Sequence, residues 1–196
     1  MTQIRTVTAG PEHASGLVAL FERSGVGCFC RYWHFTGDKN AWQERCAFSP
    51  ETNRDQMVSA LGEGSDEMRG VVALSTGSDE VVGWLKVSPA HALRKLYDQR
   101  PYRGLPVLGG DLSEVFTVGC ALVDPAFRRK KVASQMIEHA VQVARDAGAR
   151  AIDAFPFEAP EPDDALLWMG PSGAFRQAGW SEIARIGPYP VLRLNL

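Results

Sequence analysis

The sequence contains no apolar run long enough to span a bilayer, and its first residues, MTQIRTVTAGPEH, lack the apolar core of a signal peptide. The formal net charge is only −2, which gives no general attraction to nucleic acid or to an anionic membrane. Four cysteines in 196 residues are too few for a disulfide framework and are expected to be reduced thiols. These absences predict a cytoplasmic protein with neither a nucleic-acid nor a membrane partner.

What is present is the composition of an ordinary globular protein. Hydrophobic residues make up 45% of the chain and charged residues 22%, so a sizeable core can form beneath a charged surface. The length predicts a single domain over residues 1–196. A monomer and a homodimer are both compatible with this composition.

The clearest pattern runs from residue 115 to residue 148. Residues 115–123 are almost all β-branched, aromatic or small and apolar, which predicts a strand, and Asp124-Pro125 ends it. A helix follows, with Gly148 where a C-cap glycine belongs. Apolar residues recur along one face of this helix, at positions 132, 133, 136, 137, 140, 141 and 144.

Four cations, Arg128, Arg129, Lys130 and Lys131, stand where this helix begins. The N-terminus of a helix carries partial positive charge, so each misplaced cation costs about 0.3–1 kcal/mol unless something neutralises it. Unpaired backbone N–H groups, the helix dipole and cationic side chains together favour an anion site, most naturally for phosphate. The alternative is a group of solvated side chains.

The segment LVDPAFRRKKVASQMIEHAVQVARDAGA resembles the acetyl-CoA-binding motif of the GNAT N-acetyltransferase superfamily, and GPSGAFRQAGWSEI is similar to the last helix and Gly-aromatic turn of that family. The resemblance implies an enzyme that binds acetyl-CoA as co-substrate and transfers the acetyl group to a primary amine by direct attack. The acceptor is expected to be a small molecule. A non-catalytic acyl-CoA-binding module is the alternative, and a basic nucleic-acid contact module is a third reading that the acidic balance disfavours.

The resemblance also implies a binding site for the co-substrate. Backbone groups around Leu122 and Val123 would hold the pantetheine arm, and Arg128 and Arg129 would contact phosphate. The pyrophosphate would lie on the N–H groups of the turn and of the first helical residues, which comprise Arg128, Arg129, Lys130, Lys131, Val132, Ala133 and Ser134.

The chain departs from the family pattern at two positions. Lys131 stands where the central glycine of the turn is expected, and a lysine there either narrows the phosphate cradle or adds a contact. Phe175 stands where many members carry a tyrosine that protonates the departing thiolate, and a phenylalanine has no proton to give. Loss of turnover would be one consequence.

The rest of the chain predicts strands at residues 4–8, 71–74, 81–87, 151–157, 181–186 and 190–196, and further helices at 12–24, from 49 and at 172–178. With the central strand and helix, this order gives a mixed α/β sheet with one parallel β-α-β crossover, in agreement with a GNAT-like, mostly antiparallel sheet flanked by helices. Residues 88–111, with a short helix at 91–100, form either a flap beside the site or a surface excursion.

Acceptor and catalytic residues are harder to assign. Residues 25–42 form an aromatic-rich loop or broken helix expected to wall the acceptor pocket. The pocket residues predicted are Phe29, Trp33 and Trp84. The carboxylates of residues 157–171 would favour a cationic amine if they overhang the pocket, or form a solvated acidic loop. Glu114 is the first candidate for the general base, Asp111 the second, and Tyr32 a candidate for the acid.

Cys28, Cys30 and His34, with Cys46, raise the question of a metal site. Their spacing matches none of the common zinc patterns, so no metal is expected and buried structural thiols are the preferred interpretation. A nucleophilic cysteine is possible, although the sequence ties no histidine or aspartate to one.

Overall fold

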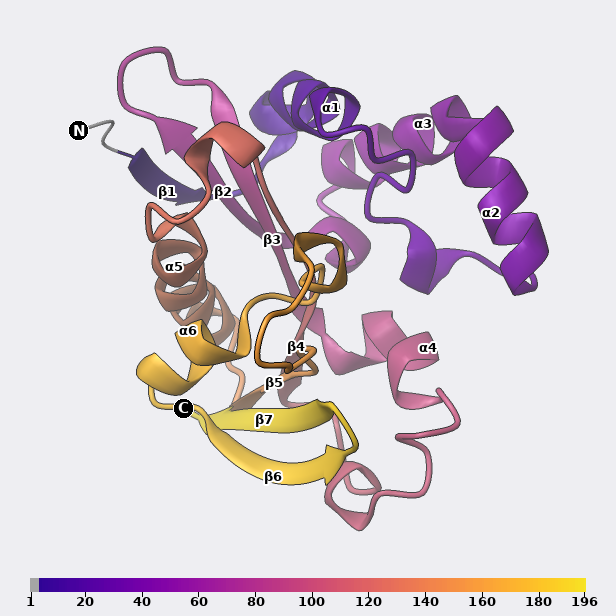
Figure 1. Cartoon of the computed structure of the whole chain (residues 1–196), viewed down its shortest axis with the longest axis vertical. Coiled ribbons are helices and arrows are strands. Elements are labelled where there is room, and N and C mark those ends of the chain that lie inside the picture. Colours follow the sequence, from indigo (N-terminus) through magenta and orange to yellow (C-terminus); the bar gives the residue numbers. More distant parts are fainter. Residues whose placement is uncertain (1–3) are drawn as a thin grey trace.

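The computed structural model describes residues 4–196, with Ala165 described only in its backbone. Its strands form one seven-stranded sheet in the order β1-β2-β3-β4-β5-β7-β6 (Figure 1). The strands are β1 Ile4–Thr8, β2 Gly70–Ser75, β3 Val81–Pro89, β4 Val115–Val123, β5 Ala151–Ala154, β6 Ser181–Ile186 and β7 Tyr189–Asn195. Strands β4 and β5 pair in parallel, and the other pairings of described strands are antiparallel, which confirms the predicted sheet.

Helices cover both faces of the sheet. They are α1 Ala14–Arg23, α2 Lys39–Phe48, α3 Pro50–Gly62, α4 Arg94–Tyr97, α5 Val132–Asp146 and α6 Ser172–Gln177. Helix α5 connects β4 to β5 and lies with α6 on one face, whereas α1 and α3 lie on the other (Figure 1). Within residues 4–196, no helix is both long and apolar enough to cross a membrane.

Strands β2 and β3 are buried along their whole length because they separate two cores. Successive side chains of a strand point to opposite faces. Accordingly, Val71 and Ala73 pack in the core that contains α5, and Val72 and Leu74 pack in the core that contains α1 and α3. This explains why both strands appear in the sequence as continuous apolar runs.

Two predictions about connections need correction. Residues 25–42 were expected to be a loop or broken helix, but α2 begins inside this segment at Lys39, where the Asp38 carboxylate accepts a hydrogen bond from the Ala41 N–H at 2.9 Å. Residues 88–111 were expected to form a flap or a surface excursion. Their apolar side chains instead build a third core, and those fully or nearly buried there include Leu93, Leu96 and Tyr97.

Strand β4 carries the irregularity that shapes the site. Its register with β3 shifts between Val118 and Cys120, which leaves Gly119 as an extra, bulged residue. A Cβ atom at Gly119 would lie 3.0 Å from Cδ of Lys86, so glycine permits a close approach of the two strands. On the other side, pairing with β5 ends at Thr117. The remaining half of β4 therefore keeps an edge that β5 does not cover.

Candidate functional site

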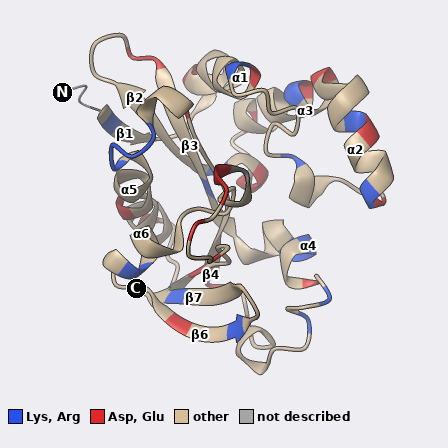
Figure 2. Ribbon diagram, viewed as in Figure 1, with Lys and Arg blue, Asp and Glu red and all other residues tan. Residues whose placement is uncertain are grey.

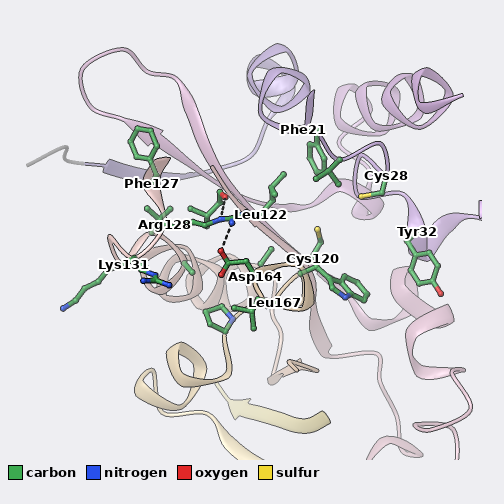
Figure 3. Close-up of a pocket in the computed structure, with 18 of the residues that line it drawn as sticks. Phe21, Cys28, Tyr32, Cys120, Leu122, Phe127, Arg128, Lys131, Asp164 and Leu167 are labelled. Atoms are coloured by element: carbon green, nitrogen blue, oxygen red, sulfur yellow. Dashed lines mark hydrogen bonds and ion pairs between the residues drawn. The ribbon is translucent and has the colours of Figure 1, made fainter. Parts of the chain in front are cut away.

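A cavity of about 670 Å³ lies along the second half of β4 and extends from the turn before α5 to an aromatic cluster (Figure 3). A volume of this size matches the usual range of small-molecule sites. The residues around it are Phe21, Val26, Cys28, Tyr32, Trp42, Cys120, Ala121, Leu122, Val123, Phe127, Arg128, Arg129, Lys131, Val132, Ala133, Asp164, Leu167, Trp168 and Pro171.

The basic turn forms one end of the cavity. Arg128, Arg129 and Lys131 line it together with the first residues of α5, whereas Lys130 and Ser134 are outside the lining. The Lys130 ammonium instead donates to the carbonyl oxygen of Ala126 at 2.7 Å and lies 5.1 Å from the centre of the Phe127 ring. Three of the four consecutive cations therefore line the cavity, and the fourth, Lys130, is bonded to the backbone of the preceding turn.

The backbone of this turn is unusual for its sequence. Arg129 has φ 58° and Lys131, the N-cap of α5, has φ 63°, both in the left-handed region that glycine adopts most easily. Figure 3 shows the Lys131 side chain extending outward, away from Leu122 and Asp164. The residue thus takes a backbone conformation that glycine adopts easily, and its side chain extends outward from the turn. The first N–H groups of α5 have no partner within the helix and favour an anion.

The uncovered edge of β4 forms the floor between the two ends. The Ala121 N–H donates to the Trp168 carbonyl oxygen at 2.7 Å. The Gly119 carbonyl accepts from Nε1 of Trp33 at 2.7 Å, and the Val123 carbonyl accepts from Nε of Arg128 at 3.3 Å. These backbone groups, which would otherwise pair with another strand, are held by other parts of the same chain.

Residues 155–171, which connect β5 to α6, cross this floor. The Asp164 carboxylate pairs with Nη1 of Arg128 at 2.7 Å, so one carboxylate of the acidic loop reaches the basic turn (Figure 3). Figure 2 shows acidic positions in red on this loop and cationic positions in blue on the turn before α5. Glu158 turns away and accepts hydrogen bonds from Ser172, Arg176 and Arg185. One of the two interpretations of the sequence was that carboxylates of this loop overhang the cavity. Of Asp164 and Glu158, only Asp164 lines the cavity.

The other end of the cavity is aromatic. The Tyr32 ring lies 5.5 Å from Trp42 and 6.3 Å from Trp168, measured between ring centres. Nζ of Lys95 lies 4.3 Å from the centre of the Tyr32 ring and donates to the Tyr32 carbonyl oxygen at 3.0 Å. Both contacts hold this ring in place.

The predicted pocket residues lie behind the lining rather than in it. Trp33 is buried and stacks on Trp168 with 5.6 Å between ring centres. Phe29 stacks on Phe21 at 5.4 Å, and Trp84 is fully buried in the same core. Aromatic content alone does not distinguish a core residue from a pocket residue, and the lining positions Trp42 and Trp168 were missed.

Of the predicted catalytic residues, the structure brings Tyr32 to the cavity and leaves the two carboxylates elsewhere. Glu114 precedes the first residue of β4, at the end of the strand far from the cavity, and pairs with Arg150 at 2.5 Å. Asp111 accepts hydrogen bonds from the backbone and hydroxyl of Ser113, both at 2.9 Å.

Other side chains at the cavity were not predicted as site residues. Cys28 and Cys120 both line it, and the only signal in the sequence was that Cys28 lies in the aromatic segment and that Cys120 follows Gly119 in the central strand. At the position of the expected tyrosine, Phe175 is fully buried with its ring 4.9 Å from Trp180. Within the described part of the chain, no group of three or more potential metal ligands is close enough together to hold an ion.

Comparison with known proteins places these features in a family. The family model described as "Acetyltransferase (GNAT) family" matches residues 31–163, which include β4, the basic turn and α5. Comparison of the sequence with curated proteins finds no significant match.

Solved structures with a similar fold include two with a bound nucleotide. A PaiA N-acetyltransferase from Thermoplasma acidophilum in complex with coenzyme A aligns with TM-score 0.54, 8% identity and 99% of each chain covered. A GNAT family acetyltransferase from Brucella melitensis in complex with acetyl-CoA aligns with TM-score 0.52 and 14% identity, over 100% of this chain and 90% of the other. A GNAT family acetyltransferase from Streptococcus pneumoniae gives 0.54 and 13%, over 99% of both chains. At these identities the likeness shows the fold.

Proposed function

Because the chain belongs to the GNAT acetyltransferase family, we propose that it transfers an acetyl group from acetyl-CoA to a primary amine of a small acceptor. The observation that carries the proposal is the layout of the cavity. Arg128, Arg129 and the N-terminus of α5 form one end, an aromatic cluster forms the other, and the half of β4 that β5 does not cover joins them. A long ligand with an anionic end fits this layout.

The residues present are compatible with each part of such a ligand. The diphosphate would lie at the N-terminus of α5, where N–H groups and two guanidinium groups supply charge-assisted hydrogen bonds. The amide-bearing arm would follow β4 near Leu122 and Val123. The Ala121 N–H is held by the Trp168 carbonyl, so residues 155–171 would have to shift before an amide could pair there.

The aromatic end is the proposed acceptor side. Tyr32, Trp42 and Trp168 line this end, and the faces of aromatic rings attract the cationic form of an amine as it enters. A small acceptor with an apolar or aromatic portion next to its amine fits this end best. The amine must lose a proton before it attacks, and Tyr32 is the predicted catalytic residue that lines the cavity.

A second candidate function is an acyl-CoA-binding module without turnover. It is favoured by Phe175, which is buried against Trp180 at the position of the expected proton donor and has no ionisable group. The two candidates bind the same ligand and differ only in release of the thiol.

Two measurements test the proposal. Titration calorimetry of the full chain with acetyl-CoA and with coenzyme A should give binding to one site. An assay for free coenzyme A thiol across a panel of small primary amines should then show amine-dependent release. Binding without release for any amine would favour the non-catalytic module, and no heat with either ligand would refute both functions.

Asp164→Asn is expected to tighten coenzyme A binding about two- to fivefold. The Asp164 carboxylate competes with phosphate for Arg128, and an ion pair whose side chains are 39% and 56% exposed is worth at most about 1 kcal/mol. Glu161→Gln removes the same charge from the same loop and is the control, with unchanged affinity. Equal effects of the two substitutions would show that only overall charge matters.

A further inference from the structure

The segment that precedes α6 occupies part of the cavity from within. Asp164, Leu167, Trp168 and Pro171 all line the cavity, and they come from one short stretch of the connection between β5 and α6. Figure 3 shows the Asp164 carboxylate pointing toward Arg128. We call residues 163–168 the strap. The strap lies in the path that the proposed ligand would follow along β4.

One contact of the strap is with the basic turn. The Asp164 carboxylate lies 2.7 Å from Nη1 of Arg128, which belongs to the guanidinium that the proposed function assigns to phosphate. Carboxylates and phosphates both accept charge-assisted hydrogen bonds from a guanidinium through their oxygen atoms. Asp164 therefore takes the position of an anionic ligand group, and a phosphate at the same Nη1 must compete with it.

The second contact of the strap is with the floor of the cavity. The Trp168 carbonyl oxygen accepts a hydrogen bond from the Ala121 N–H at 2.7 Å. This half of β4 has no strand beside it, because pairing with β5 ends at Thr117. A backbone carbonyl is the same chemical group as an amide carbonyl of the pantetheine arm. Trp168 therefore pairs with β4 as that arm would.

The two contacts follow the order of the proposed ligand. The Asp164 carboxylate lies at the basic turn, and the Trp168 carbonyl lies further back along β4, at Ala121. Coenzyme A likewise carries its diphosphate at one end of an arm that contains amide carbonyls. The strap thus substitutes for the ligand within the same chain, and strap and ligand cannot occupy these two positions together.

The strap is held more firmly at one end than at the other. Met169, directly after it, is buried in the third core. Gly170 has φ 91°, and a Cβ atom there would lie 2.8 Å from the Phe175 ring, so this position requires glycine. In contrast, the side chain of Asp164 is 56% exposed and Leu166 is 44% exposed. The strap can therefore move away from β4 while Met169 and Gly170 stay in place.

The strap also reaches the aromatic end of the cavity. The Trp168 ring stacks on Trp33 with 5.6 Å between ring centres, and its centre lies 6.3 Å from that of Tyr32 in an edge-on arrangement. Trp168 therefore bonds to β4 through its carbonyl and forms part of the proposed acceptor side through its ring. Release of the carbonyl moves both groups, so entry of the ligand also changes the acceptor side.

We propose that the strap is an autoinhibitory element: in the free chain it occupies the places of the diphosphate and of one amide of coenzyme A, which binds by displacing it. The identity of the ligand rests on the proposed function. The contacts that carry the proposal are those of Asp164 with Arg128 and of the Trp168 carbonyl with the Ala121 N–H. A displaced strap becomes more accessible when the ligand binds, whereas a lid that closes over a ligand becomes less accessible.

The first test follows the strap by limited proteolysis. The full chain is treated with chymotrypsin with and without saturating coenzyme A, and the cuts are mapped by mass spectrometry. Chymotrypsin can cut the strap at Leu166, Leu167 and Trp168, and the basic turn at Phe127. We expect coenzyme A to accelerate cleavage of the strap about threefold or more, because cleavage follows the population in which the strap is open. Cleavage after Phe127, which lines the cavity, should become slower. Slower or unchanged cleavage of the strap with coenzyme A bound would overturn the proposal.

The second test needs no ligand. Cleavage of the strap is compared in the native chain, in Asp164→Asn and in the control Glu161→Gln, which removes the same charge from the connection just before the strap. An exposed ion pair is weak, so we expect strap cleavage to be about two- to fivefold faster in Asp164→Asn. Glu161→Gln should cleave at the native rate. Equal rates in the three chains would show that Asp164 does not hold the strap closed and would contradict the proposal.

The two proposals fail in different ways. If calorimetry detects no binding of coenzyme A but Asp164→Asn accelerates cleavage of the strap, the proposed function is wrong, whereas the contact that holds the strap on the turn is confirmed. If coenzyme A binds and amines release thiol while cleavage of the strap slows or stays the same, the proposed function stands and autoinhibition by the strap is wrong.

Discussion

Arg129→Glu should weaken coenzyme A binding by about a hundredfold, whereas Lys130→Glu, one residue away, should weaken it less than about fivefold. Arg129 lines the cavity and Lys130 does not. A hydrogen bond between charged groups contributes about 1.5–3 kcal/mol, and a hundredfold loss corresponds to about 2.7 kcal/mol. The difference follows from where each side chain points, since both replacements change the net charge by the same amount.

The matched pair separates local contact from long-range attraction. Lys130 already donates to the Ala126 carbonyl, so its charge contributes to the field around the turn without a free donor for phosphate. Titration calorimetry of both variants at two salt concentrations provides the comparison. If both lose affinity equally and the loss disappears at high salt, the turn acts as a general positive field and does not cradle a phosphate.

The part of the fold that the sequence predicts well is the part set by local signals. Strand β4 is a nearly continuous run of β-branched, aromatic and small apolar residues, and helix α5 has an apolar face with a period of 3.6. A proline follows the strand and a glycine follows the helix, and the observed bounds agree with these signals. The position of the basic turn could be predicted for the same reason, because the turn lies between two elements whose positions follow from nearby residues.

The aromatic end of the cavity, the proposed acceptor side, depends on contacts that no local pattern records. Glu114 is only seven residues from Ala121, but a strand rises about 3.3 Å per residue, so the two positions lie roughly 20 Å apart along β4. Trp84 and Trp168 look alike in the sequence. Trp84 is fully buried in the core that contains α1 and α3, whereas Trp168 is 42% exposed at the cavity because residues 155–171 fold back over β4.

Helix α2 shows a different limit of sequence reasoning. Its sequence, KNAWQERCAF, has no buried residue and no continuous apolar face, and its start follows from one local contact, the Asp38 cap. The segment at residues 88–111 was misjudged in the opposite direction. Its prolines and glycines suggested a flap, but side chains such as Tyr97 and Tyr102 pack on Phe155 and hold it in a core.

Asp153→Ala is expected to lower the free energy of unfolding by about 3–5 kcal/mol. Asp153 is fully buried on β5 and accepts two hydrogen bonds from Arg193 on β7, at 2.6 and 2.8 Å. It also accepts one from the Tyr97 hydroxyl at 3.1 Å. Removing one partner of a buried ion pair leaves the other charge without compensation, which costs much more than the pair itself contributes.

Glu114→Ala is the matched control for this loss, because it removes a carboxylate from an arginine pair of similar length near the same strands. The side chains of Glu114 and Arg150 are 49% and 81% exposed, so water replaces the lost contact and the cost stays below about 1 kcal/mol. Urea unfolding of both variants measures the difference. Equal losses in the free energy of unfolding would mean that burial does not determine how much each ion pair contributes to stability. A large loss for Asp153→Ala alone would show that the parallel β4–β5 junction, next to which the cavity opens, depends on the buried charge at its last residue pair.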